Sequence, residues 1–339
     1  MYNFMGTKLM QQPQRFRTPR RFTFCPDFTK LPMEYTPQHF AALFGTTTAK
    51  LPEICKTFAT EHDFSYDLPD ATTRDEIVLR VLQHINSDES TLVGPQREDL
   101  WERCWKESLQ EFVRSEYELD ALVPKFIKPS RPVRLNQAYV LPRSPDFELA
   151  FFQVCRAFYF DKYLRGIKSA YEFGCGTGFN LVALGQQVPG AKLYGLDWAP
   201  SACEMVSLIG QKHGLDISGI PFDFFNPDRD VTLDPHSAAL TLCALEQVGP
   251  KHGAFLDFLL EKKPGICINM EPIEDFYDTK SLTDYLALMY HRKRGYLSGF
   301  LPRLKSLEAE GRITILEAKR MFFGSLYHEG YSFVVWRPL

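Results

Sequence analysis

The second half of the chain alternates short apolar runs with longer stretches of helical spacing. Apolar runs of this length are typical of buried strands. They are Ala170–Phe173, Lys192–Leu196, Ile220–Phe224, Ala238–Cys243 and Gly265–Met270. Helical spacing lies between most of them, at 180–187, 199–213 and 251–262. Strands that alternate with helices predict an α/β fold, in which a parallel sheet is sandwiched by helices.

The end of the chain departs from this alternation. Two β-rich runs, Arg312–Phe322 and Tyr331–Arg337, are joined by a short link that contains glycine. Two strands with such a link favour an antiparallel pair. We therefore expect the parallel sheet to end in an antiparallel hairpin.

The pattern before the sheet region is mainly helical, from residue 28 to 146, and prolines interrupt it. Arg97–Tyr117 has helical spacing and an apolar stripe that includes Trp101 and Trp105, which we interpret as core. The segment 122–134 is basic and broken by prolines. We expect this segment to lie over the domain that follows it.

These patterns divide the chain into three regions. Residues 1–27 are expected to be a basic, flexible tail, because no acidic residue occurs before Cys25. An organelle transit peptide is the alternative, although two prolines would interrupt the amphipathic helix that it needs. Residues 28–146 form a helical N-terminal cap region, and 147–339, which begins with a strongly apolar helix, is the α/β domain.

Composition narrows the class of function. The chain has 339 residues, of which 45% are hydrophobic, and a formal net charge of -3. This charge does not favour nucleic acid as a partner, and no apolar run approaches the roughly 20 residues that a membrane span needs. The 8 cysteines form no CxxC pair, and several lie in apolar runs, so we expect reduced thiols and a cytoplasmic protein. A small-molecule substrate is the expected partner, and nothing in the sequence indicates an oligomeric state.

A glycine-rich turn connects the first strand of the α/β region to the helix that follows. Gly174, Gly176 and Gly178 leave the inner side of this turn without a Cβ, so a ligand can lie against the backbone amides. Glu172 precedes the turn, and its charge disfavours a pyrophosphate and favours a cationic ligand. The spacing also differs from the G-x-G-x-x-G pattern of dinucleotide sites, because position 179 is Phe.

This motif resembles the acidic-x-Gly-x-Gly-x-Gly signature of the class I S-adenosylmethionine-dependent methyltransferases, which have a Rossmann-like fold. The resemblance covers residues 147–339 and includes the terminal hairpin. It implies that the chain binds S-adenosyl-L-methionine. The glycine turn would carry the amino-acid portion of this cofactor, and Glu172 would balance or orient the ammonium group.

The resemblance also assigns side chains that follow the second and third strands. Asp197 would bind both ribose hydroxyls, and Trp198 would pack on adenine. Asp223 would accept a hydrogen bond from the adenine amino group, and Phe224 would cover the ring edge. Each residue also has a structural alternative. Asp197 is then a helix cap, Asp223 is a turn residue, and the rings of Trp198 and Phe224 belong to the core. Ligands of open α/β sheets bind at the carboxyl ends of strands, so the joint placement favours a cofactor site.

Candidates for the chemistry follow the fourth and fifth strands and the terminal link. Glu246, Glu271 and His328 should face the cofactor, as candidate proton acceptors and substrate contacts. A solvated hairpin tip is the alternative for His328. A divalent ion held by the two glutamates and a histidine is a further alternative, but no compact ligand spacing supports it, and we expect no metal.

Two further segments are candidates for contacts with the ligands. The basic run 291–294, flanked by Tyr290 and Tyr296, is either a solvated face or a contact for an anionic substrate. Tyr139, upstream of the first strand, is a candidate to close over the cofactor.

The sequence therefore predicts an S-adenosylmethionine-dependent methyltransferase that acts on oxygen or nitrogen of a small molecule, for example a sugar or a natural-product intermediate. The helical N-terminal region would help to form the substrate pocket. Two alternatives stay open. One is a non-catalytic module that kept the cofactor pocket, and the other is a different transferase that uses the same cofactor, such as an aminopropyl transferase.

Overall fold

A computed structural model of the chain describes residues 34–87 and 92–339, which lie within one compact unit, Met33–Leu339. The predicted basic tail lies outside the described residues. The helices are α1 Pro37–Phe44, α2 Glu53–Glu61, α3 Ala71–Asn86, α4 Glu98–Arg114, α5 Phe147–Leu164, α6 Phe179–Gln187, α7 Pro200–His213, α8 Gly253–Lys262, α9 Leu282–Arg294 and α10 Phe300–Ala309. The strands are β1 Tyr66–Asp67, β2 Val133–Leu135, β3 Ala138–Pro142, β4 Ser169–Phe173, β5 Lys192–Asp197, β6 Ile217–Pro221, β7 Ala238–Leu242, β8 Ile266–Glu271, β9 Ile313–Lys319, β10 Phe323–Gly324 and β11 Ser332–Pro338. No described helix combines the length and the apolar character that crossing a bilayer requires.

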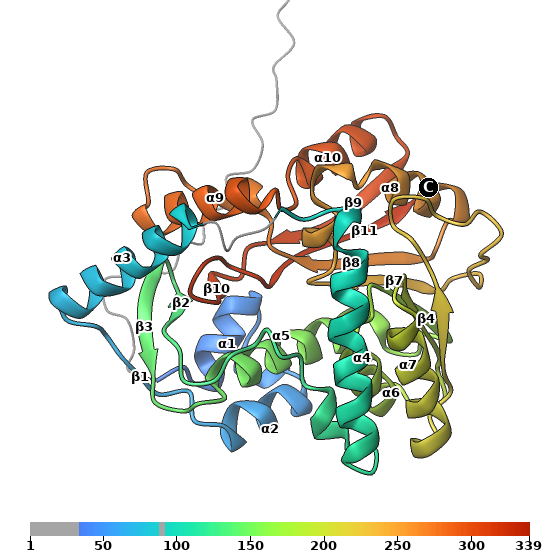
Figure 1. Cartoon of the computed structure of the whole chain (residues 1–339), viewed down its shortest axis with the longest axis horizontal. Helices are drawn as coiled ribbons and strands as arrows, with labels where there is room; N and C mark the ends of the chain where they lie inside the picture. The colour runs from blue at the N-terminus through green and yellow to red at the C-terminus, as the bar shows by residue number, and fades with distance from the viewer. Residues whose placement is uncertain (1–33, 88–91) are drawn as a thin grey trace, which may run out of the picture. The chain divides into compact units, whose positions relative to one another are not determined.

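A seven-stranded sheet has the order β6-β5-β4-β7-β8-β11-β9 (Figure 1). The strands from β6 to β8 run parallel, whereas β11 pairs antiparallel with β8 on one side and β9 on the other. The predicted fold class is confirmed, because the mainly parallel sheet ends in an antiparallel pair.

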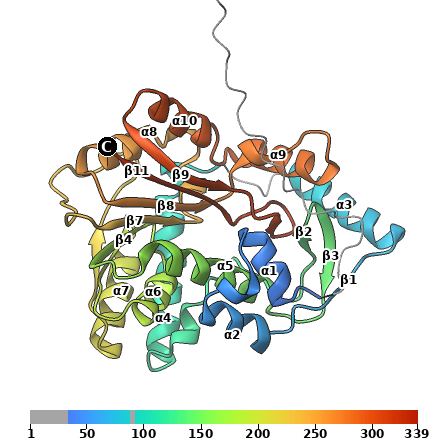
Figure 2. The same cartoon turned by 180° about the vertical axis from the view of Figure 1, so that it is seen from behind.

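Helices cover both faces of this sheet, and the alternation of side chains along each strand explains why. On β4, Ala170 packs into the core with α5, α6 and α7, whereas Tyr171 packs into the core with α8 and α10. On β11, Val335 packs into the core with α5, α6 and α7, and Trp336 packs into the core with α8 and α10. Successive strand residues point to opposite faces, so strands that are apolar throughout require two covering layers (Figure 2).

The strand order places the chemistry-bearing turns together. β5 and β7 lie on opposite sides of β4, so the order reverses there. At such a switch point the connections leave in opposite directions, and a crevice opens outside the carboxyl ends of the strands. The glycine turn follows β4 directly and therefore borders this crevice.

The third parallel strand lies earlier in the chain than predicted. β6 is Ile217–Pro221 rather than Ile220–Phe224. Among the described strands it pairs with β5 alone and forms an edge of the sheet, so its half-exposed residues carry a weak apolar signal. The stronger apolar signal came from a loop, in which Phe222 packs into the core that α8 and α10 cover.

The N-terminal region contains strands as well as the predicted helices. β1, β3, β2 and β10 form a second sheet, in that order, and β10 comes from the link between β9 and β11. The strands are too short to show a periodic pattern. The region also shares a core with the α/β part, because the ring of Phe151 lies 4.9 Å from that of Phe40 and 3.7 Å from that of Phe323. The division at residue 147 stays a prediction.

Candidate functional site

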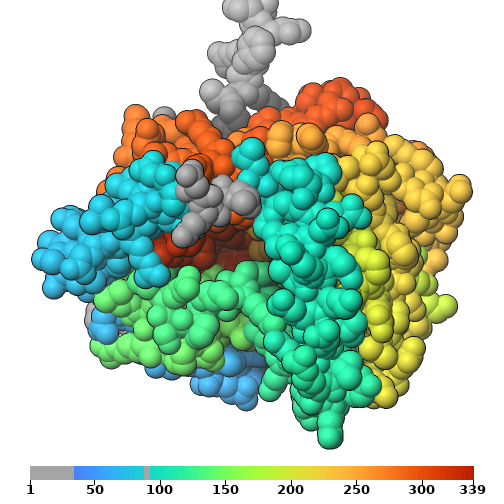
Figure 3. All heavy atoms as spheres, viewed as in Figure 1, coloured from blue at the N-terminus to red at the C-terminus, as the bar shows by residue number. Residues whose placement is uncertain are grey.

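A cavity of about 420 Å³ opens at the carboxyl ends of the parallel strands. Its walls come from the glycine turn, one face of α4, the segment between α4 and β2, the ends of β5 and β7, the end of α9 and the link before β11. The space-filling view shows this side of the molecule hollowed beside α4, which is coloured teal (Figure 3). A cavity of this size is typical of small-molecule sites.

The glycine turn forms one end of the cavity. Gly174 and Gly176 line it, with φ of 71° and 52°, in the left-handed region that disfavours residues with a Cβ. A Cβ on Gly176 would lie 2.9 Å from Cζ2 of Trp105. Gly178 does not line the cavity; a Cβ there would lie 2.9 Å from Cδ1 of Ile209, so this glycine allows α6 and α7 to pack.

Asp197, at the end of β5, fastens the glycine turn to its neighbour. Its Oδ2 accepts a hydrogen bond of 3.0 Å from the Gly176 N–H, and its Oδ1 accepts one of 3.0 Å from the Ala199 N–H. Burial raises the pKa of Asp197 to about 6, although these backbone N–H groups oppose the rise. Asp197 and the adjacent Trp198 both line the cavity.

Glu172 lies beneath the cavity rather than in its wall. It is 1% exposed, and its Oε1 accepts a hydrogen bond of 2.8 Å from Nδ2 of Asn180, which does line the cavity. The Oδ1 of Asn180 accepts a bond of 2.8 Å from the buried Arg156. Burial raises the pKa of Glu172 to about 8, and among the described residues its Oε2 has no partner. Asn180, the second residue of α6, is a site residue that was not predicted from the sequence.

Asp223 does not line the cavity. Its carboxylate accepts hydrogen bonds from the Phe225 N–H at 2.8 Å and from Nδ2 of Asn226 at 3.0 Å. These bonds are typical of a turn residue, which was the structural alternative for Asp223. Phe224 and Phe225 do line the cavity, and the ring of Phe225 lies 5.9 Å from that of Trp198. The aromatic run after β6 therefore supplies rings to the site.

Helix α4 forms one wall of the cavity with the apolar stripe that the sequence pattern assigned to the core. Leu109 and Phe112 are buried, but Trp101 and Trp105 line the cavity and stack with their ring centroids 5.3 Å apart. The helix is held in place by Glu102, whose carboxylate accepts hydrogen bonds from Ser201 Oγ at 2.6 Å and from Ser201 N at 3.1 Å. Two tryptophans four positions apart share one helical face, which is the signal that was available.

The basic segment 122–134 lies over the glycine turn, as expected. The Thr177 hydroxyl donates a hydrogen bond of 2.6 Å to the carbonyl of Leu122. Phe126 and Lys128 of this segment line the cavity. A proline-broken connector, which has no helix to form, can follow the rim of the site.

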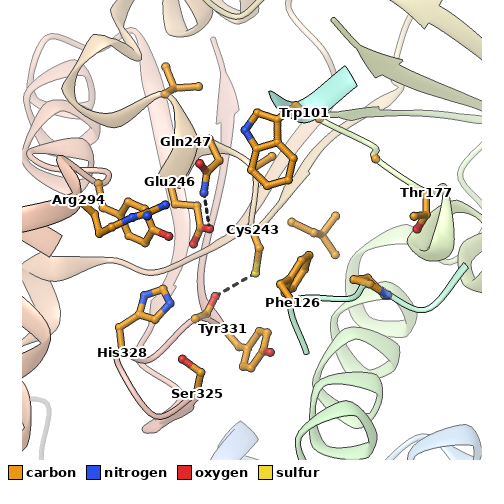
Figure 4. Close-up of a pocket in the computed structure, with 18 of the residues that line it drawn as sticks. Trp101, Phe126, Thr177, Cys243, Glu246, Gln247, Arg294, Ser325, His328 and Tyr331 are labelled. Atoms are coloured by element: carbon orange, nitrogen blue, oxygen red, sulfur yellow. Dashed lines mark hydrogen bonds between the residues drawn. The ribbon is translucent and has the colours of Figure 1, made fainter. Parts of the chain in front are cut away.

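Glu246 and Glu271 play different parts. Glu271, on β8, is fully buried, does not line the cavity and accepts backbone hydrogen bonds of 3.1 Å, 3.1 Å and 3.3 Å from Ala244, Leu245 and Glu246. It therefore holds the turn that carries Glu246. The side chain of Glu246 lines the cavity and accepts a bond of 2.9 Å from Gln247 (Figure 4). Burial raises the pKa of Glu246 to about 7.

His328 lines the cavity and is not a solvated hairpin tip. Its Nδ1 lies 3.2 Å from Nε2 of the buried His291. Burial, together with the neighbouring His291, lowers the pKa of His328 well below its ordinary value, so the ring is neutral. Tyr139, the other ring proposed near the ligands, is buried among α3 and α9 and does not line the cavity.

A third carboxyl group in the cavity, besides those of Asp197 and Glu246, comes from α5. Glu148 is 8% exposed, lines the cavity and accepts a hydrogen bond of 2.9 Å from the hydroxyl of Tyr331. Burial raises the pKa of Glu148 to about 7. Neither Glu148 nor Tyr331 was predicted from the sequence, because Glu148 lies in an apolar helix whose orientation toward the site depends on packing.

Among residues 34–87 and 92–339, no group of three or more His, Cys, Asp and Glu side chains is arranged to hold a metal ion.

The comparisons with known proteins concern the fold. No protein-family model matches the chain, and no curated protein matches it in sequence. Among solved structures, an O-methyltransferase from neocarzinostatin biosynthesis is 15% identical with a TM-score of 0.39, and covers 57% of this chain and 58% of its own. Human N-acetylserotonin methyltransferase is 18% identical with a TM-score of 0.39, over 57% of this chain and 56% of its own. Mitomycin 7-O-methyltransferase is 16% identical with a TM-score of 0.39, over 58% and 59%. The match therefore spans less than two thirds of each of these structures.

Proposed function

We propose that this chain is an S-adenosylmethionine-dependent methyltransferase that acts on oxygen or nitrogen of a small molecule. One observation carries the proposal. The glycine turn after β4, the pair Asp197 and Trp198 after β5, and Glu246 after β7 border a single cavity. A nucleoside with a cationic centre would meet backbone amides, a carboxylate and a flat ring at successive strand ends, and a proton acceptor would lie across from them.

The residues present fit the cofactor. The glycine turn, which lines the cavity through Gly174 and Gly176, would carry the amino-acid portion, and Trp198 and Phe224 offer faces for the adenine ring. Asp197 lines the cavity beside the glycine turn and would bind the ribose hydroxyls, the role that the resemblance implies. Glu172 would act through Asn180, because only the amide side chain reaches the cavity wall.

When bound, the sulfonium supplies a methyl group whose C–S bond electrons stay on sulfur as the new bond to the acceptor forms. Glu246 is placed to take the proton that the acceptor hydroxyl or amine loses, because a carboxylate with a pKa of about 7 is both available and basic near neutral pH. His328 is the weaker candidate, since its depressed pKa makes it a poor proton acceptor. Trp101 and Trp105 keep water from the reacting atoms.

Calorimetry with S-adenosylhomocysteine tests the cofactor half of the proposal. We expect binding by the wild-type chain and a loss of at least tenfold in affinity for Asp197→Asn, since the carboxylate both orders the glycine turn and faces the ligand. Asp216→Asn, on an exposed side chain before β6, is the matched control and should bind as the wild type does. Absence of binding by the wild type would overturn the proposal.

Transfer of label from methyl-labelled S-adenosylmethionine tests the acceptor half. We incubate the wild-type chain with cell extract separated into low-mass, protein and nucleic-acid fractions. Label should enter the low-mass fraction, and Glu246→Gln should reduce the rate there. Label found only in nucleic acid or protein would contradict the small-molecule acceptor, and tight cofactor binding with no label in any fraction would favour a non-catalytic module.

A further inference from the structure

The face of α4 that lines the cavity runs from the glycine turn to a pair of arginines. Trp105 touches Gly176, Trp101 stacks on Trp105, and the guanidinium of Arg97 lies 5.2 Å from the ring centroid of Trp101. Trp101 and Trp105 are four positions apart and share one face of α4, and Arg97 is the residue directly before this helix. Eight positions of helical rise separate Arg97 from Trp105 by about 12 Å. Arg97 therefore lies well away from the glycine turn.

Arg97 meets Arg294, from the end of α9, in the wall of the same cavity. Burial and the charge of Arg294 both lower the pKa of Arg97, as expected of two cations that share a partly desolvated space. Figure 4 shows Arg294 pointing toward Glu246 and Gln247. Segments far apart in the chain thus bring two positive side chains to one place.

Neither arginine forms an ion pair with another described residue. The arginine ion pairs in the described part of the chain involve other arginines: Arg74, Arg134, Arg143, Arg165, Arg229, Arg303, Arg312 and Arg320. The Nε atoms of Arg97 and Arg294 are buried, and within residues 34–87 and 92–339 neither has a hydrogen-bond partner. Two partly buried cations that line one cavity without forming an ion pair are costly, which points to a ligand that supplies anionic oxygens.

The surroundings fix the two guanidinium groups. Nη1 of Arg97 donates a hydrogen bond of 2.7 Å to Oε1 of Gln247, and the guanidinium of Arg294 lies 5.2 Å from the ring centroid of Tyr296. Glu246 is the neighbouring carboxyl, and its charge offsets one arginine at most. The local charge is therefore positive whether Glu246 is protonated or ionised.

We propose that Arg97 and Arg294 bind an anionic group of the acceptor, a carboxylate or a phosphate, at the end of the cavity away from the glycine turn. That the anion belongs to the methyl acceptor rests on the proposed function, whereas the anion site itself does not. The oxygens of the anion accept hydrogen bonds from the two guanidinium groups, and this contact orients the acceptor so that its reactive atom lies between Glu246 and the glycine turn.

The test uses the full chain and three probes of similar shape: 1-naphthoate, 1-naphthyl phosphate and the uncharged 1-naphthamide. Binding is followed by tryptophan fluorescence, with and without S-adenosylhomocysteine. We expect at least one anionic probe to bind at least tenfold more tightly than the amide. The preferred anion distinguishes a carboxylate from a phosphate. In Arg97→Gln and Arg294→Gln this preference should fall to less than threefold.

Arg114→Gln, on the exposed end of α4, and Arg292→Gln, on the exposed face of α9, are the matched controls and should keep the preference. Equal binding of all three probes by the wild type would overturn the anion site, and that comparison needs no variant to fold. Persistence of the preference in both glutamine variants would also overturn it. If the wild-type chain prefers an anionic probe but does not bind S-adenosylhomocysteine, the proposed function is rejected and the anion site is retained.

Discussion

At the scale of single residues, burial of carboxyl groups is the main electrostatic feature of the site. Glu148, Glu172 and Glu246 have pKa values raised to about 7, 8 and 7, each chiefly by burial. A carboxyl group in a poorly solvated place holds its proton more tightly than one in water. The protein therefore changes its charge around this cavity near neutral pH.

The pH dependence of stability should show this for Glu172. Its folded pKa of about 8 is above the ordinary value of 4.5, so the stability it contributes is fully present below pH 4.5 and is lost as pH rises through about 8. Urea unfolding at pH 5.5 and pH 8.5 should show a loss for the wild type that exceeds the loss for Glu172→Gln by about 1–3 kcal/mol. Glu61→Gln, on an exposed side chain, should behave as the wild type does. Equal losses for the wild type and Glu172→Gln would contradict a neutral buried carboxyl.

The rate of methyl transfer should depend on the ionisation of Glu246. With the acceptor found by label transfer, we expect kcat to rise with pH up to a plateau above about 7, because only the carboxylate accepts the proton. Glu246→Gln should lower kcat by about 10²–10⁴-fold and abolish the rise. A retained pH profile in Glu246→Gln would assign the proton transfer to another group. Glu98→Gln, at the exposed start of α4, is the control.

At the scale of elements, the site depends on junctions between neighbouring strands. Asp197 of β5 ties the glycine turn after β4, and Glu271 of β8 ties the turn after β7. Each carboxylate accepts backbone N–H groups that have no partner in the sheet ladder. The two junctions hold the segments that face the cavity; Asp197 also lines the cavity itself, whereas Glu271 does not.

Replacement of Glu271 should therefore act on stability and on the position of Glu246 together. Glu271→Gln leaves one oxygen to accept from three N–H groups, and we expect a loss of about 1–3 kcal/mol in the free energy of unfolding. Urea unfolding measures it, with Glu204→Gln, on the exposed face of α7, as control. An unchanged unfolding midpoint in Glu271→Gln would show that these hydrogen bonds do not hold the turn.

At the scale of the whole described molecule, the N-terminal region and the sheet share one core. Phe151 of α5 is fully buried and lies against the rings of Tyr35, Phe40 and Phe323, with centroid distances of 5.1 Å, 4.9 Å and 3.7 Å. These partners come from both ends of the described chain. The region before the sheet is therefore a structural part of the fold as well as a wall of the cavity.

Phe151→Ala should lower the free energy of unfolding by about 3–5 kcal/mol, since it empties a space that several rings surround. Circular dichroism and tryptophan fluorescence should report the same unfolding midpoint, because both parts lose the shared core together. Phe126→Ala is the control: its ring is 55% exposed, and its removal should change stability by less than about 0.5 kcal/mol. Two separate transitions in Phe151→Ala would show that the two regions fold independently.

Much of the fold was predictable from the sequence because its signals are local. β4, β5, β7 and β8 are mainly apolar and lie within one residue of their predicted ends. The edge strand β6 was misplaced, and the short strands β1 to β3 were missed, because partly exposed or very short strands carry little apolar pattern.

Only part of the cavity lining could be predicted from the sequence. Several predicted residues line the cavity: Gly174, Gly176, Asp197, Trp198, Phe224, Glu246 and His328. Four others do not: Glu172, Gly178, Asp223 and Glu271. A position just after a strand places a residue at the correct edge of the sheet. It does not decide whether the side chain faces the ligand or the backbone of the next turn.

The sequence alone determined the alternation of strand and helix, the terminal hairpin and the position of the glycine turn, because each follows from the spacing of neighbouring residues. Only the tertiary structure decided that Trp105 covers Gly176, that Glu148 faces the cavity and that Arg97 meets Arg294. These contacts join segments that no local pattern connects. They exist because burial of the shared apolar core fixes how α4, α5 and α9 pack around the strand ends.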